Sequence, residues 1–302
     1  MTRRVAIIGV FDGVHRGHQA VIAQARALAT GGDVVAITFD PHPRRLLTPD
    51  RAPSMLVSLD ERIDALKDAG VDDVVVVPFT QDLSAMTPRE FVEDFVVQRA
   101  RATDVVVGEN FRFGNKASGD VAALGELGHE LDFRVHGINL RGDGDNSVSF
   151  SSTRVREALR DGDLVQVALV LGRPFTYRGV VVHGDHRGRT LGVPTANIEV
   201  TEDRAAPADG VYAGWVRTVD SHDRMPAAIS VGTNPQYAGT ARRIEAHVID
   251  RDDLDLYGRE IEVGFTARLR GQQVFESEEA FVAQMQADIQ VARRTNGSAQ
   301  LT

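Results

Sequence analysis

Residues 9–18 read Gly-Val-Phe-Asp-Gly-Val-His-Arg-Gly-His, a glycine-rich stretch between two segments of different periodicity. A continuous apolar run at residues 5–8 precedes it, and apolar residues recur with helical spacing from Val21 to Ala29 after it. This pattern predicts a buried strand, a turn and a helix. Glycines at 9, 13 and 17 let the backbone approach a ligand closely, and a helix N-terminus attracts anions. The stretch therefore predicts a phosphate-binding turn.

The two histidines of this stretch, His15 and His18, stand three residues apart at the start of the expected helix. At that spacing both side chains project from one face. Two imidazoles beside a phosphate site suit an enzyme that stabilises charge on the α-phosphate of a nucleotide. The alternative is a glycine-rich turn with two solvated histidines, which would be favoured for an isolated Gly-x-Gly loop. The coincidence of glycines, histidine pair and strand–helix context favours the nucleotide site.

Composition narrows the class of protein. The 302 residues are enough for two domains. The net charge of −9, without a basic tract, argues against nucleic acid as a partner. The lack of cysteine excludes disulfides, thiolate catalysis and Cys–zinc sites. Asp12 interrupts the first apolar run too early for a signal peptide, and no run is long enough to cross a membrane. We expect a cytoplasmic protein without membrane partners; the sequence leaves its oligomeric state open.

The first half alternates apolar runs with helical segments. The runs lie at residues 34–39, 74–77 and 105–107, and capping boxes at Ser58–Glu61 and Thr87–Glu90 open helices between them. This alternation predicts a doubly wound parallel α/β domain, whose ligands bind at the carboxyl ends of the strands. Asn110 follows the third run and can hydrogen-bond a ribose or phosphate there. The alternative is a connecting loop whose phenylalanines close the local core.

A second polar cluster opens a helix near residue 152. Ser152 and Thr153 are typical N-cap residues, and Arg154 and Arg156 follow in the same turn. Two guanidinium groups at this point can clamp a leaving pyrophosphate. The structural alternative is a plain N-cap, with Arg154 pointing to solvent.

Beyond about residue 170 the pattern changes to short strands separated by turns, at 180–183, 211–216, 227–231, 244–249 and 261–269. Such strands without intervening helices predict a compact antiparallel barrel. One amphipathic helix follows from Glu278 toward Arg294, with a frayed tail expected after Thr295.

Several polar residues of the second half can carry chemistry. Gly184 to Arg189 is a glycine-flanked loop suited to phosphates, and Gly192 opens a Gly-Val-Pro-Thr-Ala-Asn segment. In that segment Thr195 and Asn197 offer oxygen ligands of the kind Mg²⁺ accepts. Glu245 is a carboxylate within an otherwise apolar strand. Each feature has a structural alternative: a hairpin, a turn, or a carboxylate on a solvated strand face.

Together these stretches resemble a known family. Residues 9–18 resemble the His-x-Gly-His signature of the nucleotidyltransferases, in the longer form of the prokaryotic bifunctional riboflavin kinase/FAD synthetases. Residues 151–156 resemble the Ser-Ser-Thr-x-x-Arg signature of that superfamily, and residues 194–197 the Pro-Thr-Ala-Asn signature of the riboflavin kinase module. The resemblance spans Arg3 to Ala292. It departs at residues 234–237, where Asn-Pro-Gln-Tyr stands in place of the commoner Pro-Thr-Phe and puts the substrate contacts there in doubt.

The resemblance implies an FMN adenylyltransferase domain of nucleotidyltransferase fold at residues 1–170 and a riboflavin kinase domain at 171–302. The substrates would be ATP, riboflavin and FMN, with Mg²⁺ as cofactor. The implied catalytic residues are His15, His18, Arg156 and Glu245, and Thr195 and Asn197 would bind the metal. The residues implied to bind nucleotide or flavin are Gly9, Phe11, Asp12, Gly17, Asn110, Ser152, Thr153, Arg154, Gly184, Arg189, Gly192, Pro194 and Tyr237. The alternatives are a kinase with an inactive first domain, which the intact histidines argue against, and a flavin-binding regulator without turnover.

Overall fold

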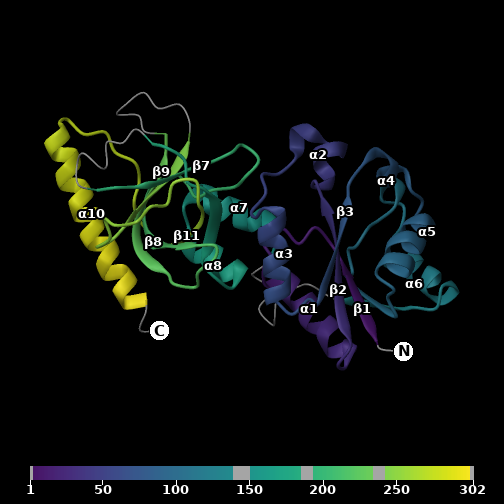
Figure 1. Cartoon of the computed structure of the whole chain (residues 1–302). Helices are drawn as coiled ribbons and strands as arrows, with labels where there is room; N and C mark the ends of the chain where they lie inside the picture. Colours follow the sequence, from purple (N-terminus) through teal and green to yellow (C-terminus); the bar gives the residue numbers. More distant parts are fainter. Residues whose placement is uncertain (1–2, 139–149, 185–192, 234–241, 300–302) are drawn as a thin grey trace. The chain divides into compact units, whose positions relative to one another are not determined.

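The computed structural model describes residues 3–138, 150–184, 193–233 and 242–299. By contacts between residues the chain separates into two compact units, Met1–Ser152 and Thr153–Thr302 (Figure 1). Helices α7 (Ser152–Asp161) and α8 (Leu164–Leu171) therefore belong almost entirely to the second unit. The domain boundary expected from the sequence, after residue 170, lies at the end of α8.

The first unit contains a parallel five-stranded sheet, as the alternation of runs predicted. Its strands are β1 (Arg4–Ile8), β2 (Asp33–Asp40), β3 (Asp73–Pro78), β4 (Asp104–Gly108) and β5 (Arg134–Ile138). Their order is β3-β2-β1-β4-β5, so the chain reverses direction across the sheet at β1. The carboxyl end of β1 is thus the switch point at which such sheets bind ligands. The sequence pattern missed β5 because this edge strand is only half-buried and lacks a continuous apolar run.

Helices cover both faces of this sheet (Figure 1). Alternate residues of the strands enter two separate apolar clusters. One cluster includes the buried side of α1 (Arg16–Ala29) and Leu66 of α3 (Leu59–Asp68). The other includes α5 (Pro88–Phe91), the π-helix η2 (Val92–Arg99) and α6 (Val121–Glu130). The remaining short helices are α2 (Pro43–Leu47), α4 (Gln81–Ala85), η1 (Pro49–Arg51) and η3 (Asn115–Ala117). Both predicted capping boxes are present.

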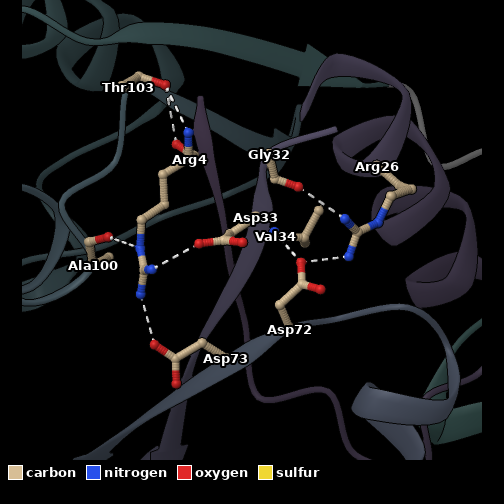
Figure 2. Close-up of polar contacts among 9 residues, drawn as sticks. All are labelled: Arg4, Arg26, Gly32, Asp33, Val34, Asp72, Asp73, Ala100 and Thr103. Atoms are coloured by element: carbon tan, nitrogen blue, oxygen red, sulfur yellow. Dashed lines mark hydrogen bonds and ion pairs between the residues drawn. The ribbon is translucent and has the colours of Figure 1, made fainter. Parts of the chain in front are cut away.

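Arginines join strands at the amino edge of the sheet, opposite the switch point (Figure 2). Arg4 donates to the carbonyl of Ala100 at 2.7 Å and to the carboxylates of Asp33 and Asp73 at 3.2 and 2.6 Å. Arg26 donates in the same way to Asp72. These side chains are partly exposed, so each ion pair contributes only about 0–1 kcal/mol.

Asp104 is a buried carboxylate at the same edge, at the start of β4. Burial by itself would raise its pKa. Hydrogen bonds from His136, Arg3, Thr103 and Arg134 outweigh that effect and lower the pKa of Asp104 to about 2. The carboxylate is therefore ionised at neutral pH.

The second unit is an antiparallel, nearly closed barrel. Its strands are β6 (Phe175–Val180), β7 (Ala196–Glu199), β8 (Gly210–Thr218), β9 (Met225–Gly232), β10 (Arg243–Val248) and β11 (Glu260–Arg270). They are ordered β6-β11-β8-β9-β10-β7, and a bridge between Val182 and Asn197 joins the two ends. The strand expected at 180–183 lies earlier, because Phe175 and Tyr177 supply the buried positions. β7 was not predicted; it is formed by residues assigned to the metal-binding motif.

Helix α10 (Glu278–Ala299) packs along the barrel (Figure 1). Ile289 and Ala292 of the predicted apolar face are buried there. The frayed tail expected after Thr295 was wrong, because the helix continues and the buried Asn296 donates its side-chain amide to the carbonyl of Gly214 at 2.8 Å. This bond anchors the last turn.

Candidate active sites

The turn after β1 has a strained backbone. Phe11, Gly13 and Val14 have φ angles of 53°, 81° and 40°. A positive φ is unusual for any residue with a side chain and more so for a β-branched one. Phe11 and Val14 are nevertheless buried, at 2% and 1% exposure. Such a conformation persists only where surrounding contacts hold it, and it is commonest at functional sites.

Two neighbouring segments hold this turn. On the β2 side, the Gly9 amide donates to the carbonyl of Ile37 at 3.1 Å, and the Thr38 hydroxyl donates to the carbonyl of Val10 at 3.1 Å. On the other side, the Ser152 hydroxyl donates to the carbonyl of Asp12 at 2.8 Å. Ser152 therefore lies against the turn.

Asp12 holds the turn through its side chain. The carboxylate is buried and accepts hydrogen bonds from the backbone amides of Leu56 and Val57, at 2.9 and 3.3 Å. Asp12 was expected to bind a nucleotide. In the structure one of its carboxylate oxygens ties the turn to the segment leading into α3.

His15 and His18 lie together at the start of α1. His15 is the N-cap, and its Nδ1 accepts a hydrogen bond from the His18 amide at 3.4 Å. Because Nδ1 accepts, the proton of a neutral His15 is on Nε2. The two rings stack at a centroid distance of 3.6 Å, and the Phe11 ring meets His18 edge-on at 5.2 Å. The predicted pairing of the histidines on one face is present.

His18 titrates abnormally. Burial of the ring, and secondly the charge of His15, hold the pKa of His18 well below its usual 6.5. Its Nδ1 is buried without a hydrogen-bond partner in the described part of the chain. His18 is thus neutral at pH 7 and can still donate one N–H. A strongly shifted pKa beside a strained turn is typical of functional sites.

The glycines of this turn make room for rings. A Cβ on Gly17 would lie 3.1 Å from the His15 ring and 3.3 Å from the carbonyl oxygen of Phe150. A Cβ on Gly9 would lie 3.2 Å from the Phe11 ring. Both glycines therefore permit the close packing of side chains from this turn.

Arg62, which the sequence analysis did not single out, also contacts the turn. It is fully buried, and its Nη1 donates to the carbonyls of Val10 and Phe39 at 3.0 and 2.9 Å. A signal was present in the sequence: the spacing of Leu59, Arg62 and Leu66 puts the arginine on the apolar face of its helix.

The loop after β4 contains Asn110, another residue predicted for the first site, and two phenylalanines. Asn110 is exposed after the carboxyl end of β4, at the same edge as the turn. Phe111 stacks on Phe113 at 5.4 Å and packs against the core, so the aromatic part of this loop has the structural role given as the alternative.

Thr153, Arg154 and Arg156 lie on α7 within the second unit. Thr153 is exposed and Arg156 is half-buried. The Arg154 guanidinium donates to the side-chain oxygen of Gln166 on α8, at 3.0 and 3.3 Å, rather than pointing to solvent.

The metal-binding candidates of the second unit meet beside Glu245. The Asn197 amide donates to the hydroxyl of Thr195 at 3.3 Å, so these two side chains touch. In the pairing of β10 with β7, Glu245 stands directly opposite Asn197, and paired residues share one face of a sheet. A Cβ on Gly184 would lie 2.6 Å from the Asn197 amide, which places that loop residue here too. The Pro194 carbonyl is paired with Nδ1 of His247 at 2.9 Å.

A cavity opens beside Glu245, between the sheet and α10. Its apolar lining includes Val211, Ile229, Phe275, Phe281 and Met285. Its polar lining includes Thr195, Ser230, Arg243, Glu245, His247, Arg270 and Asp288. Apolar side chains together with a few polar groups are the usual lining of a small-molecule site. Arg189, Gly192 and Tyr237, also predicted for this site, lie outside the described residues.

Comparison with known families finds a matching protein family for each of the two parts of the chain. Residues 1–154 match the model of FAD synthetase, and residues 171–296 match the model of riboflavin kinase. The chain belongs to the bifunctional riboflavin kinase/FMN adenylyltransferase family. The relative of that name from Escherichia coli K12 is 37% identical over 97% of this chain and 93% of its own length. The one from Listeria monocytogenes is 35% identical over 96% and 91%.

A solved structure from Streptococcus pneumoniae agrees in fold. It is 31% identical, covers 97% of this chain and 94% of its own, and has a TM-score of 0.83. That protein is described as a macrolide-efflux protein. Both family models name flavin enzymes instead, and none of the helices in the described ranges has the length and apolarity needed to span a membrane. This neighbour therefore supports the architecture alone.

Proposed function

We propose that the part of the chain that contains the antiparallel barrel phosphorylates riboflavin with ATP to give FMN, and that the part that contains the parallel sheet transfers AMP from ATP to FMN, giving FAD and pyrophosphate. The observation that carries this proposal is the pair of constellations found together in one chain. One is the stacked His15–His18 pair at a helix N-terminus, and the other is Glu245 opposite Asn197 beside an apolar cavity.

For adenylyl transfer, an oxygen of the FMN phosphate attacks the α-phosphorus of ATP, and the bond to the β-phosphate oxygen breaks. A nucleophilic side chain is not needed, so the enzyme contributes orientation and stabilisation of charge. His15 and His18 donate N–H groups to the α-phosphate together with the N-terminus of α1. We assign Arg156 to the leaving pyrophosphate, and Gly9, Phe11, Gly17, Asn110, Ser152 and Thr153 to the nucleotide pocket.

For phosphorylation, Glu245 accepts the proton of the terminal ribityl hydroxyl as that oxygen attacks the γ-phosphorus and ADP leaves. The flavin ring occupies the cavity, and its ribityl chain reaches Glu245. We place Gly184, Arg189, Gly192, Pro194 and Tyr237 around the ATP and flavin of this step.

The metal assignment rests on the chemistry of Thr195 and Asn197. Their hydroxyl and amide oxygens fit Mg²⁺, which keeps several waters and binds few protein ligands. When bound, Mg²⁺ would neutralise charge on the ATP phosphates. We further propose that the two activities map to residues 1–170 and 171–302 and that the protein works in the cytoplasm.

One assay separates the proposal from its alternatives. The protein is incubated with riboflavin, ATP and Mg²⁺, and the flavins are resolved by chromatography. FAD is expected; FMN alone would indicate an inactive first domain, and unchanged riboflavin a non-catalytic flavin binder. In the His15→Ala/His18→Ala double variant FMN should still form. FAD formation should fall by about 10²–10³ for each donor lost, and native FAD formation by this variant would refute the site assignment.

A further inference from the structure

Arg62 is the largest fully buried side chain among the described residues, and it lies under the first site. It projects from the first turn of α3 and spans the carboxyl ends of two neighbouring strands. At β1 its Nη1 donates to the carbonyl of Val10, and at β2 it donates to that of Phe39. Its Nη2 donates to Asp40 at 2.8 Å. One guanidinium thus fixes the positions of both strand exits.

The position is an expensive one for a cation. Arg62 has no exposed surface, while the side chain of Asp40, with which it forms an ion pair, is 42% exposed. Its Nε is buried and unpaired within the described residues. Burying a charge this way costs free energy that an apolar residue of similar size would not incur. Stability of the fold is therefore a weak explanation for an arginine at this place.

We propose that Arg62 is a positioning residue for adenylyl transfer: it holds the Val10 carbonyl, and through it the strained turn that places the two histidines. This inference rests on the His15–His18 site proposed above. Arg62 is too deeply buried to touch a nucleotide, so it acts through the turn.

The route from Arg62 to the histidines is short. Val10 is followed directly by Phe11, which has a φ of 53° and whose ring contacts the His18 ring edge-on. The Val10 carbonyl accepts from both Arg62 and Thr38, so two donors fix its direction. Loss of the guanidinium would let this peptide rotate and let Phe11 relax from its strained conformation. The His18 ring would then lose its edge contact.

The test compares Arg62→Met with Arg4→Met. Methionine keeps an unbranched apolar chain and removes every donor. Arg4 is the matched control because its guanidinium also bonds a carbonyl and carboxylates of the same sheet, but at the opposite edge (Figure 2). Both variants are assayed well below their unfolding temperatures. The readouts are kcat and KM for FAD formation from FMN and ATP, with FMN formation from riboflavin as the internal reference.

Arg62→Met should lower kcat for FAD formation by about 10²-fold, the effect of misplacing reacting groups by about 1 Å. The KM for ATP should change less than kcat, and added guanidinium ion should restore part of the rate. Arg4→Met should form FAD at the parental rate, and both variants should form FMN normally. Parental kcat in Arg62→Met, or an equal fall in both variants, would overturn the proposal.

Arg62→Lys covers the case in which the methionine variant does not fold. Lysine keeps the charge but cannot reach two carbonyls and Asp40 at once. Its kcat should fall about tenfold, and a parental kcat would overturn the proposal. The His15→Ala/His18→Ala variant distinguishes a failure of the site assignment from a failure of the role proposed for Arg62. If that variant keeps FAD formation, the site assignment fails; if it loses FAD formation while the Arg62 variants keep it, only the role of Arg62 fails.

Discussion

Gly17→Ala tests whether the close approach of Gly17 to the His15 ring matters for catalysis. The new methyl group would lie 3.1 Å from Cε1 and Nδ1 of His15 and 3.3 Å from the Phe150 carbonyl oxygen. Ordinary carbon contacts are about 3.5–4.0 Å, so the His15 ring must shift by roughly half an ångström. It has little freedom to do so, because its face is stacked on His18 at 3.6 Å.

Two opposing effects set the change in stability. Alanine in place of glycine stabilises a helix by up to about 1 kcal/mol, and crowding a packed site costs about 1–3 kcal/mol. The free energy of unfolding of the first unit should therefore fall by only about 0–2 kcal/mol. Catalysis is more sensitive, since a 1 Å misplacement can cost about 10²-fold. We expect FAD formation to fall roughly tenfold while FMN formation stays normal.

Gly125→Ala is the matched control. Gly125 lies within α6 of the same unit, and nothing stands within 4 Å of the position its Cβ would take. This variant should be about 0.5–1 kcal/mol more stable and form FAD at the parental rate. The assays are chromatography of flavins from FMN and ATP, and urea unfolding. A Gly17→Ala variant with parental FAD formation would refute the reasoning from His15 crowding, and equal loss of both activities would point to misfolding.

Three further predictions concern other parts of the chain. Glu245→Gln should lower the rate of riboflavin phosphorylation by about 10²–10⁴-fold and leave FMN adenylylation unchanged, as measured by steady-state rates. A parental rate of phosphorylation would show that Glu245 is not the catalytic base. Asn197→Ala should raise the Mg²⁺ concentration that gives half-maximal FMN formation by about tenfold or more. A Mg²⁺ titration measures this concentration, and an unchanged value would argue against Asn197 as a metal ligand. For Asp104, the folded-state pKa of about 2 lies below the ordinary 3.8, so its stabilising contribution of about 2 kcal/mol is present above pH 3.8 and lost as pH falls toward 2. Urea unfolding across this range should show a weaker pH dependence in Asp104→Asn, and identical slopes would contradict the shift.

Local sequence was sufficient for the elements whose signals are local. The apolar runs at 34–39, 74–77 and 105–107 became parallel strands, because β-branched runs of this kind suit a sheet with helices on both faces. Capping boxes were identified correctly because they consist of neighbours in the chain. The position of His15 and His18 at the start of a helix was likewise predicted from neighbours in the chain, namely the glycine-rich turn and the helical spacing that follows it. Where local signals were weak, as at the half-buried β5, the element was missed.

Tertiary structure alone decided what the side chains touch. The sequence offered Asp12 and Arg154 as nucleotide-binding residues, and only the structure shows that Asp12 also accepts from Leu56 and Val57 and that Arg154 donates to Gln166. The opposition of Glu245 and Asn197 likewise depends on strand register, since a shift of one residue would move Glu245 to the other face. Arg62 shows most clearly what the sequence alone does not predict. Its spacing from Leu59 and Leu66 indicates that it is buried, but only the packing of α3 against two strand ends brings its guanidinium to Val10 and Phe39.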